Sequence, residues 1–270
     1  MSPHGTGDLR TISDYIQCNS GIALPKNKAY LLEQRLQPLL EELGCASLGA
    51  LTHRATVDAS GDLRRRILDA ISTQETSFYR DPRTYKWLQD HWAPSALKAN
   101  RMRYSIWSAA CSTGQEAFSL AMDLCSNLHP ADLPRFNVIG TDLSQPALAQ
   151  ARSGSYSETE ISRGLPADRK KRFFEARDGR WYLKDPPKRL VTFRRQNLLR
   201  DWKTIGTMDV ILVRNILIYF DLETRQRILR GMAKHLRHDG VLLLGSTELM
   251  PPDVPLTRQE RDGVVYFVPA

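Results

Sequence analysis

Three short polar stretches, each directly after an apolar run, could carry chemistry in this chain of 270 residues. The stretch 110–114 follows the apolar run 104–107, Asp142 follows the run 136–141, and Arg214 with Asn215 follows the run 209–213. In an open α/β sheet, ligands bind beyond the carboxyl ends of the strands. We therefore expect these side chains to meet in one cleft.

The residue types in these stretches favour an adenosine ligand without phosphates. The small residues of 110–114 let a ligand approach the backbone closely, but the turn is not GxGxxG, the loop that grips a pyrophosphate. Glu116 at the start of the following helix would repel a pyrophosphate and would suit an amine or a sulfonium. Asp142 could accept both hydroxyls of a ribose. Together these features suit S-adenosylmethionine, although each alone could be a turn glycine or a helix-capping acid.

Arg214 and Asn215 stand inside an otherwise apolar stretch, 209–220. Polar residues at the carboxyl end of a buried strand are candidates for ligand contact, or they decorate the surface. An arginine in such apolar surroundings is costly unless it is paired. We therefore expect Arg214 to have a partner.

The elements that position these residues form an α/β domain. Strands and helices alternate from residue 81 onward, which predicts a doubly wound, largely parallel sheet. The predicted strands are 104–107, 136–141, 209–213, 241–244 and 264–268, and the main predicted helices are 82–91, 115–124 and 223–236. Between them, 180–183 and 190–193 flank Asp185-Pro186-Pro187 and read as a small inserted hairpin.

The first part of the chain, residues 1–80, predicts a small all-helical domain. Leucines recur at helical spacing up to Gly44, and Pro38 should kink or split that helix. A further helix is predicted to begin at a cap, Ser60 or Asp62, with Arg64, Arg65 and Arg66 away from its apolar face. We assign residues 81–270 to the α/β domain, with a β-subdomain inserted at about 153–196.

The positive charge is concentrated in one segment. The chain has 38 Lys and Arg and 30 Asp and Glu, a net charge of +8, and residues 163–200 alone hold 13 basic and 4 acidic residues, a net of +9. Such a segment suits nucleic acid, an acidic membrane surface or an acidic protein. The four cysteines include no CxxC pair, which favours reduced thiols in the cytoplasm and no zinc site.

Five motifs, in this order, resemble the CheR chemotaxis receptor methyltransferases. They are QETSFYRD at 74–81, WSAACSTGQE at 107–116, GTDLS at 140–144, QNLL at 196–199 and RNILIYF at 214–220. The resemblance implies a class I S-adenosylmethionine-dependent domain behind a helical N-terminal domain, with a small β insertion. It also implies methylation of glutamate side chains on the cytoplasmic helical bundle of chemoreceptors, which gives glutamate methyl esters and S-adenosylhomocysteine.

The resemblance implies a role for each matching residue. Arg80 and Tyr219 would orient substrate and methyl donor, and Arg64, Arg65 and Arg66 could face the substrate helix. The implied cofactor contacts are Gln74, Thr76, Arg80, Glu116, Asp142, Asn197, Leu198, Arg214 and Asn215. The β insertion could hold a receptor C-terminal peptide, as in some relatives. Gln74 departs from the Asn that is common in the family, Gln115 from a Glu, and Phe78-Tyr79 from a Phe-Phe pair.

The expected setting is a monomer in the cytoplasm at receptor arrays, without metal, nucleic acid or membrane insertion. One alternative is a nucleic-acid methyltransferase, since Asp185-Pro186-Pro187 imitates part of a DPPY signature. However, Lys188 stands where an aromatic residue should stack on a flipped base. The other alternative is a non-catalytic S-adenosylmethionine-sensing adaptor, against which the full set of motif residues argues.

Overall fold

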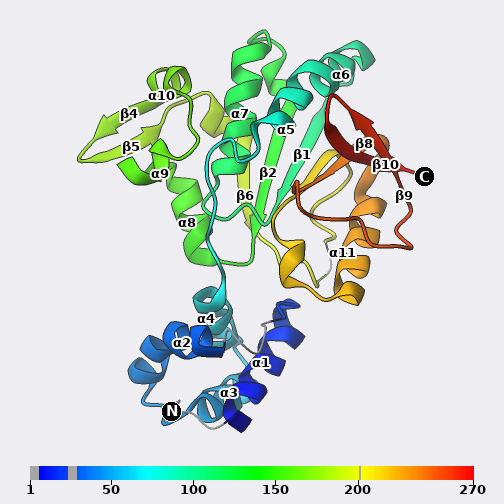
Figure 1. Ribbon diagram of the computed structural model, residues 1–270. Helices are drawn as coiled ribbons and strands as arrows, with labels where there is room; N and C mark the ends of the chain where they lie inside the picture. Colours follow the sequence, from blue (N-terminus) through cyan, green and yellow to red (C-terminus); the bar gives the residue numbers. More distant parts are fainter. Residues whose placement is uncertain (1–5, 24–28, 201) are drawn as a thin grey trace.

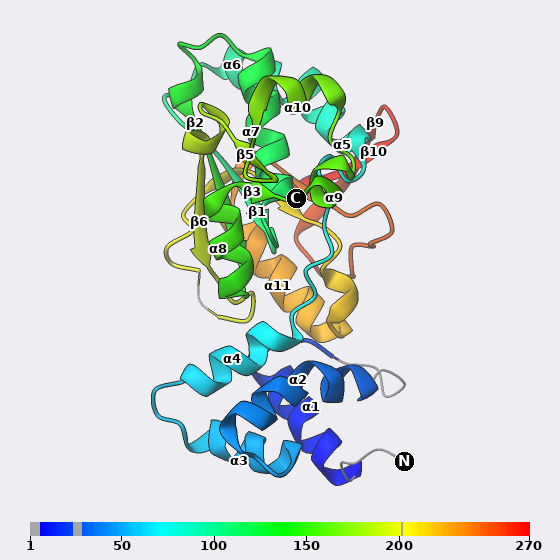
Figure 2. The same cartoon turned by 90° about the vertical axis from the view of Figure 1, so that its left-hand side faces the viewer.

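Four helices form the N-terminal part of the protein. The computed structural model describes residues 6–23, 29–200 and 202–270. The helices are α1 (Thr6–Ser20), α2 (Ala29–Leu43), α3 (Leu48–Val57) and α4 (Asp62–Ile71). Their apolar faces, with Ile12, Leu36, Leu51 and Ile67 fully buried, make a core separate from that of the sheet. Figures 1 and 2 show this bundle on one side of the sheet domain, joined to it by the segment after α4.

Two local details of these helices differ from the expectation. Helix α2 continues through Pro38 to Leu43 and is not split. The N-cap position of helix α4 is Gly61, in the left-handed conformation, and not Ser60 or Asp62. The Asp58 carboxylate accepts from the Leu63 N–H at 2.8 Å and from the Ser60 N–H at 3.0 Å. The Ser60 hydroxyl accepts from the Asp62 N–H at 3.1 Å, so Asp58 and Ser60, which both precede the helix, together satisfy its first N–H groups.

A seven-stranded sheet forms the second part, in the order β6-β2-β1-β7-β8-β10-β9. Strands β6, β2, β1, β7 and β8 are parallel, and β10 and β9 add antiparallel pairs at one edge. This confirms the predicted fold class, although β9 was not predicted. The strands are β1 (Tyr104–Ala109), β2 (Phe136–Asp142), β6 (Val191–Arg195), β7 (Met208–Val213), β8 (Leu236–Leu244), β9 (Leu256–Arg261) and β10 (Val264–Pro269).

Helices cover both faces of this sheet (Figure 1). One buried cluster joins α7 (Gln115–Asn127) and α8 (Gln145–Ser153) to one face, with Phe118, Phe136 and Leu148 in its interior. The other joins α11 (Leu222–His235) to the opposite face, with Ile211 and Leu242. The predicted helix 82–91 runs on as α5 (Pro82–Trp87), a π-helical turn (Leu88–Trp92) and α6 (Ala93–Ala99). Both faces are thus buried, as a parallel sheet requires.

The predicted hairpin of 180–183 with 190–193 is wrong. Strand β5 (Arg180–Leu183) instead pairs with β4 (Phe174–Arg177) and β3 (Ser155–Tyr156) in a three-stranded antiparallel subsheet. Strand β6 lies parallel to β2, with Val191 opposite Val138. The insertion proposed at 153–196 therefore includes one strand of the main sheet. Helices α9 (Glu158–Ser162) and α10 (Ala167–Phe173) complete the subdomain.

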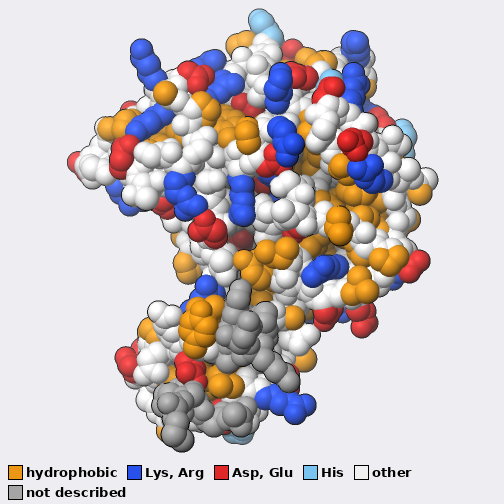
Figure 3. All heavy atoms as spheres, in the orientation of Figure 1, with side chains coloured by type: hydrophobic (Ala, Val, Ile, Leu, Met, Phe, Trp, Pro, Cys, Tyr) orange, Lys and Arg blue, Asp and Glu red, His pale blue; other side chains and the backbone are white. Residues whose placement is uncertain are grey.

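Part of the basic charge in 163–200 is neutralised within the protein. Arg163 pairs with Glu75, Lys170 pairs with Glu158, and the buried Asp123 of α7 receives Arg169 at 3.2 Å. Positive and negative side chains accordingly alternate over the visible face in Figure 3. The segment is thus less of a free cationic surface than its composition suggests.

The described parts of the chain contain neither a membrane-spanning helix nor a cluster of metal ligands. No helix there is long and apolar enough to span a bilayer. The same residues contain no group of three His, Cys, Asp or Glu side chains placed to hold a metal ion.

Candidate active site

A cleft lies beyond the carboxyl ends of β1, β2 and β7, where the strand-end residues were expected to meet. Ser20 and Ile22 at the end of α1 also line it, so both parts of the protein form its walls. The predicted cofactor-contact and orienting residues all line this one cleft: Gln74, Thr76, Arg80, Glu116, Asp142, Asn197, Leu198, Arg214, Asn215 and Tyr219.

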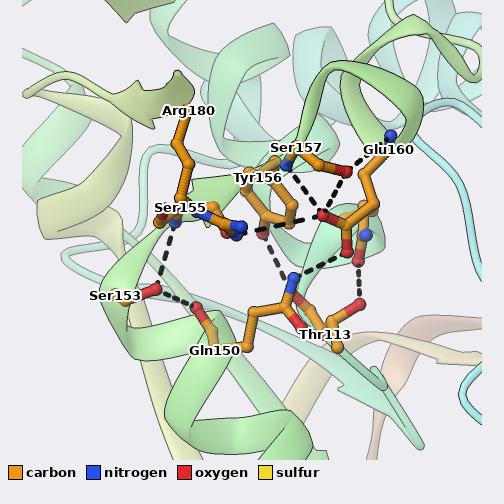
Figure 4. Close-up of polar contacts among 9 residues, drawn as sticks. Thr113, Gln150, Ser153, Ser155, Tyr156, Ser157, Glu160 and Arg180 are labelled. Carbon is orange, nitrogen blue, oxygen red and sulfur yellow. Dashed lines mark hydrogen bonds and ion pairs between the residues drawn. The ribbon is translucent and has the colours of Figure 1, made fainter. Parts of the chain in front are cut away.

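The loop between β1 and α7 forms one wall of the cleft. Gly114 has φ +93°, and a Cβ there would lie 2.9 Å from the Ala151 Cβ, so glycine is needed for both conformation and space. Tyr156 of β3, which is fully buried, donates its hydroxyl to the Thr113 carbonyl at 2.8 Å. Figure 4 shows this contact beside the network of Gln150 and Glu160. The subsheet therefore holds the loop in place.

Asp142 at the end of β2 presents a buried carboxylate to the cleft. Its Oδ2 accepts from the Ser112 N–H at 2.8 Å, and its Oδ1 accepts from the Ser144 N–H at 2.9 Å. Burial raises the pKa of Asp142, against the effect of these backbone N–H groups. A carboxylate offers about four acceptor sites, so acceptor sites remain for further donors. Two neighbouring hydroxyl groups would match them.

Arg214 has the carboxylate partners that its apolar surroundings required: Glu116, and Asp81, whose Oδ2 lies 3.6 Å from the Arg214 Nη2. Its side chain is 2% exposed, and its Nη1 lies 3.1 Å from Glu116 Oε2. Its Nη2 donates to the Arg80 carbonyl at 2.7 Å. The other Glu116 oxygen accepts from the Ser108 hydroxyl at 2.7 Å. The charge of Glu116, which we expected to face an amine or sulfonium, is thus balanced inside the protein by Arg214.

Glu248 does not line the cleft but positions a residue that does, and the sequence analysis missed it. Its Oε2 accepts from the N–H groups of Asn215 at 2.7 Å and Gly245 at 2.9 Å, and its Oε1 accepts from the Leu217 N–H at 2.7 Å. These bonds hold Asn215 in its left-handed conformation, φ 59°. Glu248 follows β8 at the same edge of the sheet, so the rule that found Asp142 would also have found it.

The end of α1 is bonded to the cleft wall. Asn197 donates its side-chain N–H to the Asn19 carbonyl at 2.7 Å and accepts from the Leu199 N–H at 2.9 Å. The Ala23 N–H donates to the Tyr219 carbonyl at 2.8 Å. The Asn197 side chain therefore shapes the wall through bonds to the protein itself.

Gln74 reaches the β1–α7 loop, because its Oε1 accepts from the Ser112 hydroxyl at 2.8 Å. The three arginines expected at the substrate do not line the cleft. Arg65 pairs with Asp62 at 2.6 Å, and Arg66 pairs with Glu42. Arg64 is exposed and forms no ion pair with the described residues. It lines a separate depression that Arg195 and Arg200 also border.

Comparison with known proteins covers almost the whole chain. Residues 7–72 match the family model described as CheR methyltransferase, all-alpha domain, and residues 74–264 match CheR methyltransferase, SAM binding domain. The chain is 38% identical to a chemotaxis protein methyltransferase of Vibrio parahaemolyticus (89% of this chain, 88% of the relative). It is 36% identical to chemotaxis protein methyltransferase 1 of Pseudomonas aeruginosa (96% and 97%). It is 31% identical to the chemotaxis protein methyltransferase of Escherichia coli (89% and 83%).

Proposed function

The chain belongs to the CheR methyltransferase family, and from this premise we propose that it methylates glutamate side chains on the cytoplasmic helical bundle of chemoreceptors. The methyl donor is S-adenosylmethionine, and the products are glutamate 5-O-methyl esters and S-adenosylhomocysteine. The observation that carries this proposal is the buried Asp142 carboxylate, which faces the cleft with acceptor sites left for a ribose.

The proposed reaction needs alignment more than acid–base catalysis. When bound, S-adenosylmethionine supplies an electrophilic methyl group on a sulfonium. A glutamate carboxylate is already ionised at neutral pH, so its oxygen can bond to the methyl carbon while the carbon–sulfur bond breaks and its electron pair stays on sulfur. No proton moves. Holding reactants in line can lower a barrier by about 7–11 kcal/mol.

The cleft residues fit separate parts of this task. Asp142 would accept from the ribose hydroxyls, and the backbone at Leu198 would line the adenosine. Arg80 is exposed at the cleft, where its guanidinium could receive the incoming glutamate carboxylate. Tyr219 would lie beside the transferred methyl group and would orient that group and the substrate carboxylate toward each other. Glu116 and Arg214 would keep this wall neutral and fixed.

Replacing Tyr219 by phenylalanine should lower turnover about 10- to 100-fold, because one positioning hydrogen bond of about 1.5–3 kcal/mol is lost. Binding of S-adenosylmethionine, measured by calorimetry, should stay unchanged. Tyr30→Phe, at an exposed tyrosine of α2, is the matched control. Loss of cofactor affinity in Tyr219→Phe would contradict the orienting role.

Reversing the charge of Arg64 should raise the KM for receptor about 3- to 10-fold and flatten its dependence on salt, because an acidic helix would lose a free cation. Arg66→Glu is the comparison, since Glu42 already neutralises Arg66 and the change should be smaller. Initial rates at several salt concentrations measure both. An unchanged KM at low salt in Arg64→Glu would remove Arg64 from the substrate surface.

The function itself is tested with labelled S-adenosylmethionine and purified receptor cytoplasmic fragments, with and without their C-terminal tails. We expect label on the receptor that is released by mild base, as a carboxyl ester is. Label on nucleic acid, or base-stable label, would overturn the proposal. The nucleic-acid alternative also depends on Asp185-Pro186-Pro187 lying at the cleft. This segment precedes β6 and so lies toward the amino ends of the strands, away from the cleft. No transfer to any receptor would favour the adaptor alternative.

A further inference from the structure

Exposed apolar side chains gather at one place beside the cleft. Among the described residues, six large apolar side chains are more than half exposed, and three of them are Ile218 (56%), Leu222 (56%) and Leu249 (84%). We name these three residues the apolar rim. Figure 3 shows hydrophobic side chains over the region of the loop after β8 and the start of α11.

Hydrogen bonds place the three segments of the apolar rim side by side. Glu248, next to Leu249, accepts from the Leu217 N–H at 2.7 Å, next to Ile218. The loop then runs along α11, which Leu222 begins. Its backbone carbonyls at Pro252 and Asp253 accept from Gln226 at 3.1 Å and from Arg230 at 2.7 Å. The rim is therefore one surface made of three chain segments.

This surface is continuous with the mouth of the cleft. Ile218 lines the cleft and is also 56% exposed, and Tyr219 is its neighbour in the chain. A glutamate that enters the cleft must therefore bring its own flanking residues close to the rim. Exposed apolar patches beside a binding cleft mark contact surfaces for other molecules.

We propose that the apolar rim docks the helical segment that carries the methyl-accepting glutamate, by contact with apolar side chains about one helical turn from that glutamate. The inference rests on the proposed function and specifies its substrate. Side chains three or four residues apart share one face of a helix. A helix whose glutamate points into the cleft would thus place those neighbours over Leu222 and Leu249.

Charges of both signs surround the rim, because the exposed Asp221 and Glu223 flank Leu222 in the chain and two arginines of α11 lie nearby. Arg225 and Arg230 border the rim, and each is held through Nε by a backbone carbonyl, of Phe220 and Asp253 respectively, at 2.7 Å. Neither forms an ion pair with a carboxylate in the described chain. An amphipathic helix with glutamates beside an apolar stripe would meet cations at its acidic edge and leucines at its apolar edge.

The test is a kinetic comparison with full-length protein and a soluble helical receptor fragment. The double variant Leu222→Ser/Leu249→Ser should raise the KM for receptor at least fivefold, with kcat and the affinity for S-adenosylmethionine unchanged. Ile218 is left intact because it lines the cleft. Met102→Ser is the matched control, since Met102 is 92% exposed and precedes β1, near the amino end of that strand, whereas the cleft lies beyond the carboxyl ends of the strands. An unchanged KM in the double variant would overturn the proposal.

A second measurement uses the receptor side of the contact. Serine in place of the apolar residues one turn from the target glutamate should raise the KM of the wild-type enzyme but add little to that of the double variant. Fully additive effects would overturn the contact. A change of oligomeric state in the double variant, seen by light scattering, would assign the rim to a second copy of this chain instead. If the wild-type protein methylates no receptor, the proposed function fails first, which is a different result.

Discussion

Replacing Asp142 by alanine is expected to abolish measurable binding of S-adenosylmethionine in calorimetry. The variant would lose the charge-assisted hydrogen bonds that the carboxylate is proposed to accept from two ribose hydroxyls. At about 1.5–3 kcal/mol each, their loss would weaken binding roughly 100- to 10,000-fold. Turnover with receptor should fall in parallel at ordinary cofactor concentration.

The control for this variant must separate the ribose contact from the local backbone, because Asp142 also accepts from the Ser112 and Ser144 N–H groups. Asp69→Asn is suitable. Asp69 accepts from the Gln145 N–H at 3.0 Å but does not line the cleft. It should bind the cofactor normally. Intact binding in Asp142→Ala would remove the ribose assignment, and near-ultraviolet circular dichroism would show whether the fold around the cleft is kept.

The second large effect concerns stability. Replacing Arg214 by methionine should lower the free energy of unfolding by about 3–5 kcal/mol, because Glu116 would keep its charge in a largely buried position without a counter-charge. Urea denaturation of the variant and the parent measures the difference. The exposed pair of Arg258 and Glu260, 2.6 Å apart, is the matched control. Arg258→Met should leave stability nearly unchanged, since exposed pairs contribute little.

A double variant tests the cause of this loss. Arg214→Met/Glu116→Gln removes both charges, while the new amide oxygen can still accept from the Ser108 hydroxyl. It should recover much of the stability lost in Arg214→Met, as expected when an uncompensated buried charge is the main cost. If the double variant is no more stable than Arg214→Met, the unpaired charge of Glu116 is not the main cost, and the other contacts of Arg214, with the Arg80 carbonyl, with Asp81 and in packing, explain the effect.

The sequence predicted the centre of the cleft because the constraint there is geometric. Parallel strands end at one edge, so Asp142 and Arg214 had to approach one another whatever the details of packing. The sequence also predicted that Arg214 needs a partner, because a buried cation is costly in any fold. That rule could not predict which residue is the partner, because Glu116 lies 98 residues away in the sequence.

The errors concern pairings between distant segments. The pattern of 190–193 indicated a strand, but nothing local showed that its neighbour is β2 and not β5. The charge of Arg66 is visible in the sequence, whereas its neutralisation by Glu42 depends on how α2 packs against α4. Asp58 shares the N–H groups at the start of α4 with Ser60 for a similar reason, since several nearby acids and hydroxyls could serve them.

The bonds from the end of α1 to the cleft bear on how this protein could be recombined. The Ala23 N–H supports the turn that carries Tyr219, and the Asn19 carbonyl receives Asn197. A chimaera could join the helices of one homologue to the sheet of another at the segment after α4. In each of these two hydrogen bonds, the donor and the acceptor would then come from different homologues. Such hybrids should work best when the donor sequence around 17–23 is transplanted together with its matching 196–199 and 217–221 stretches.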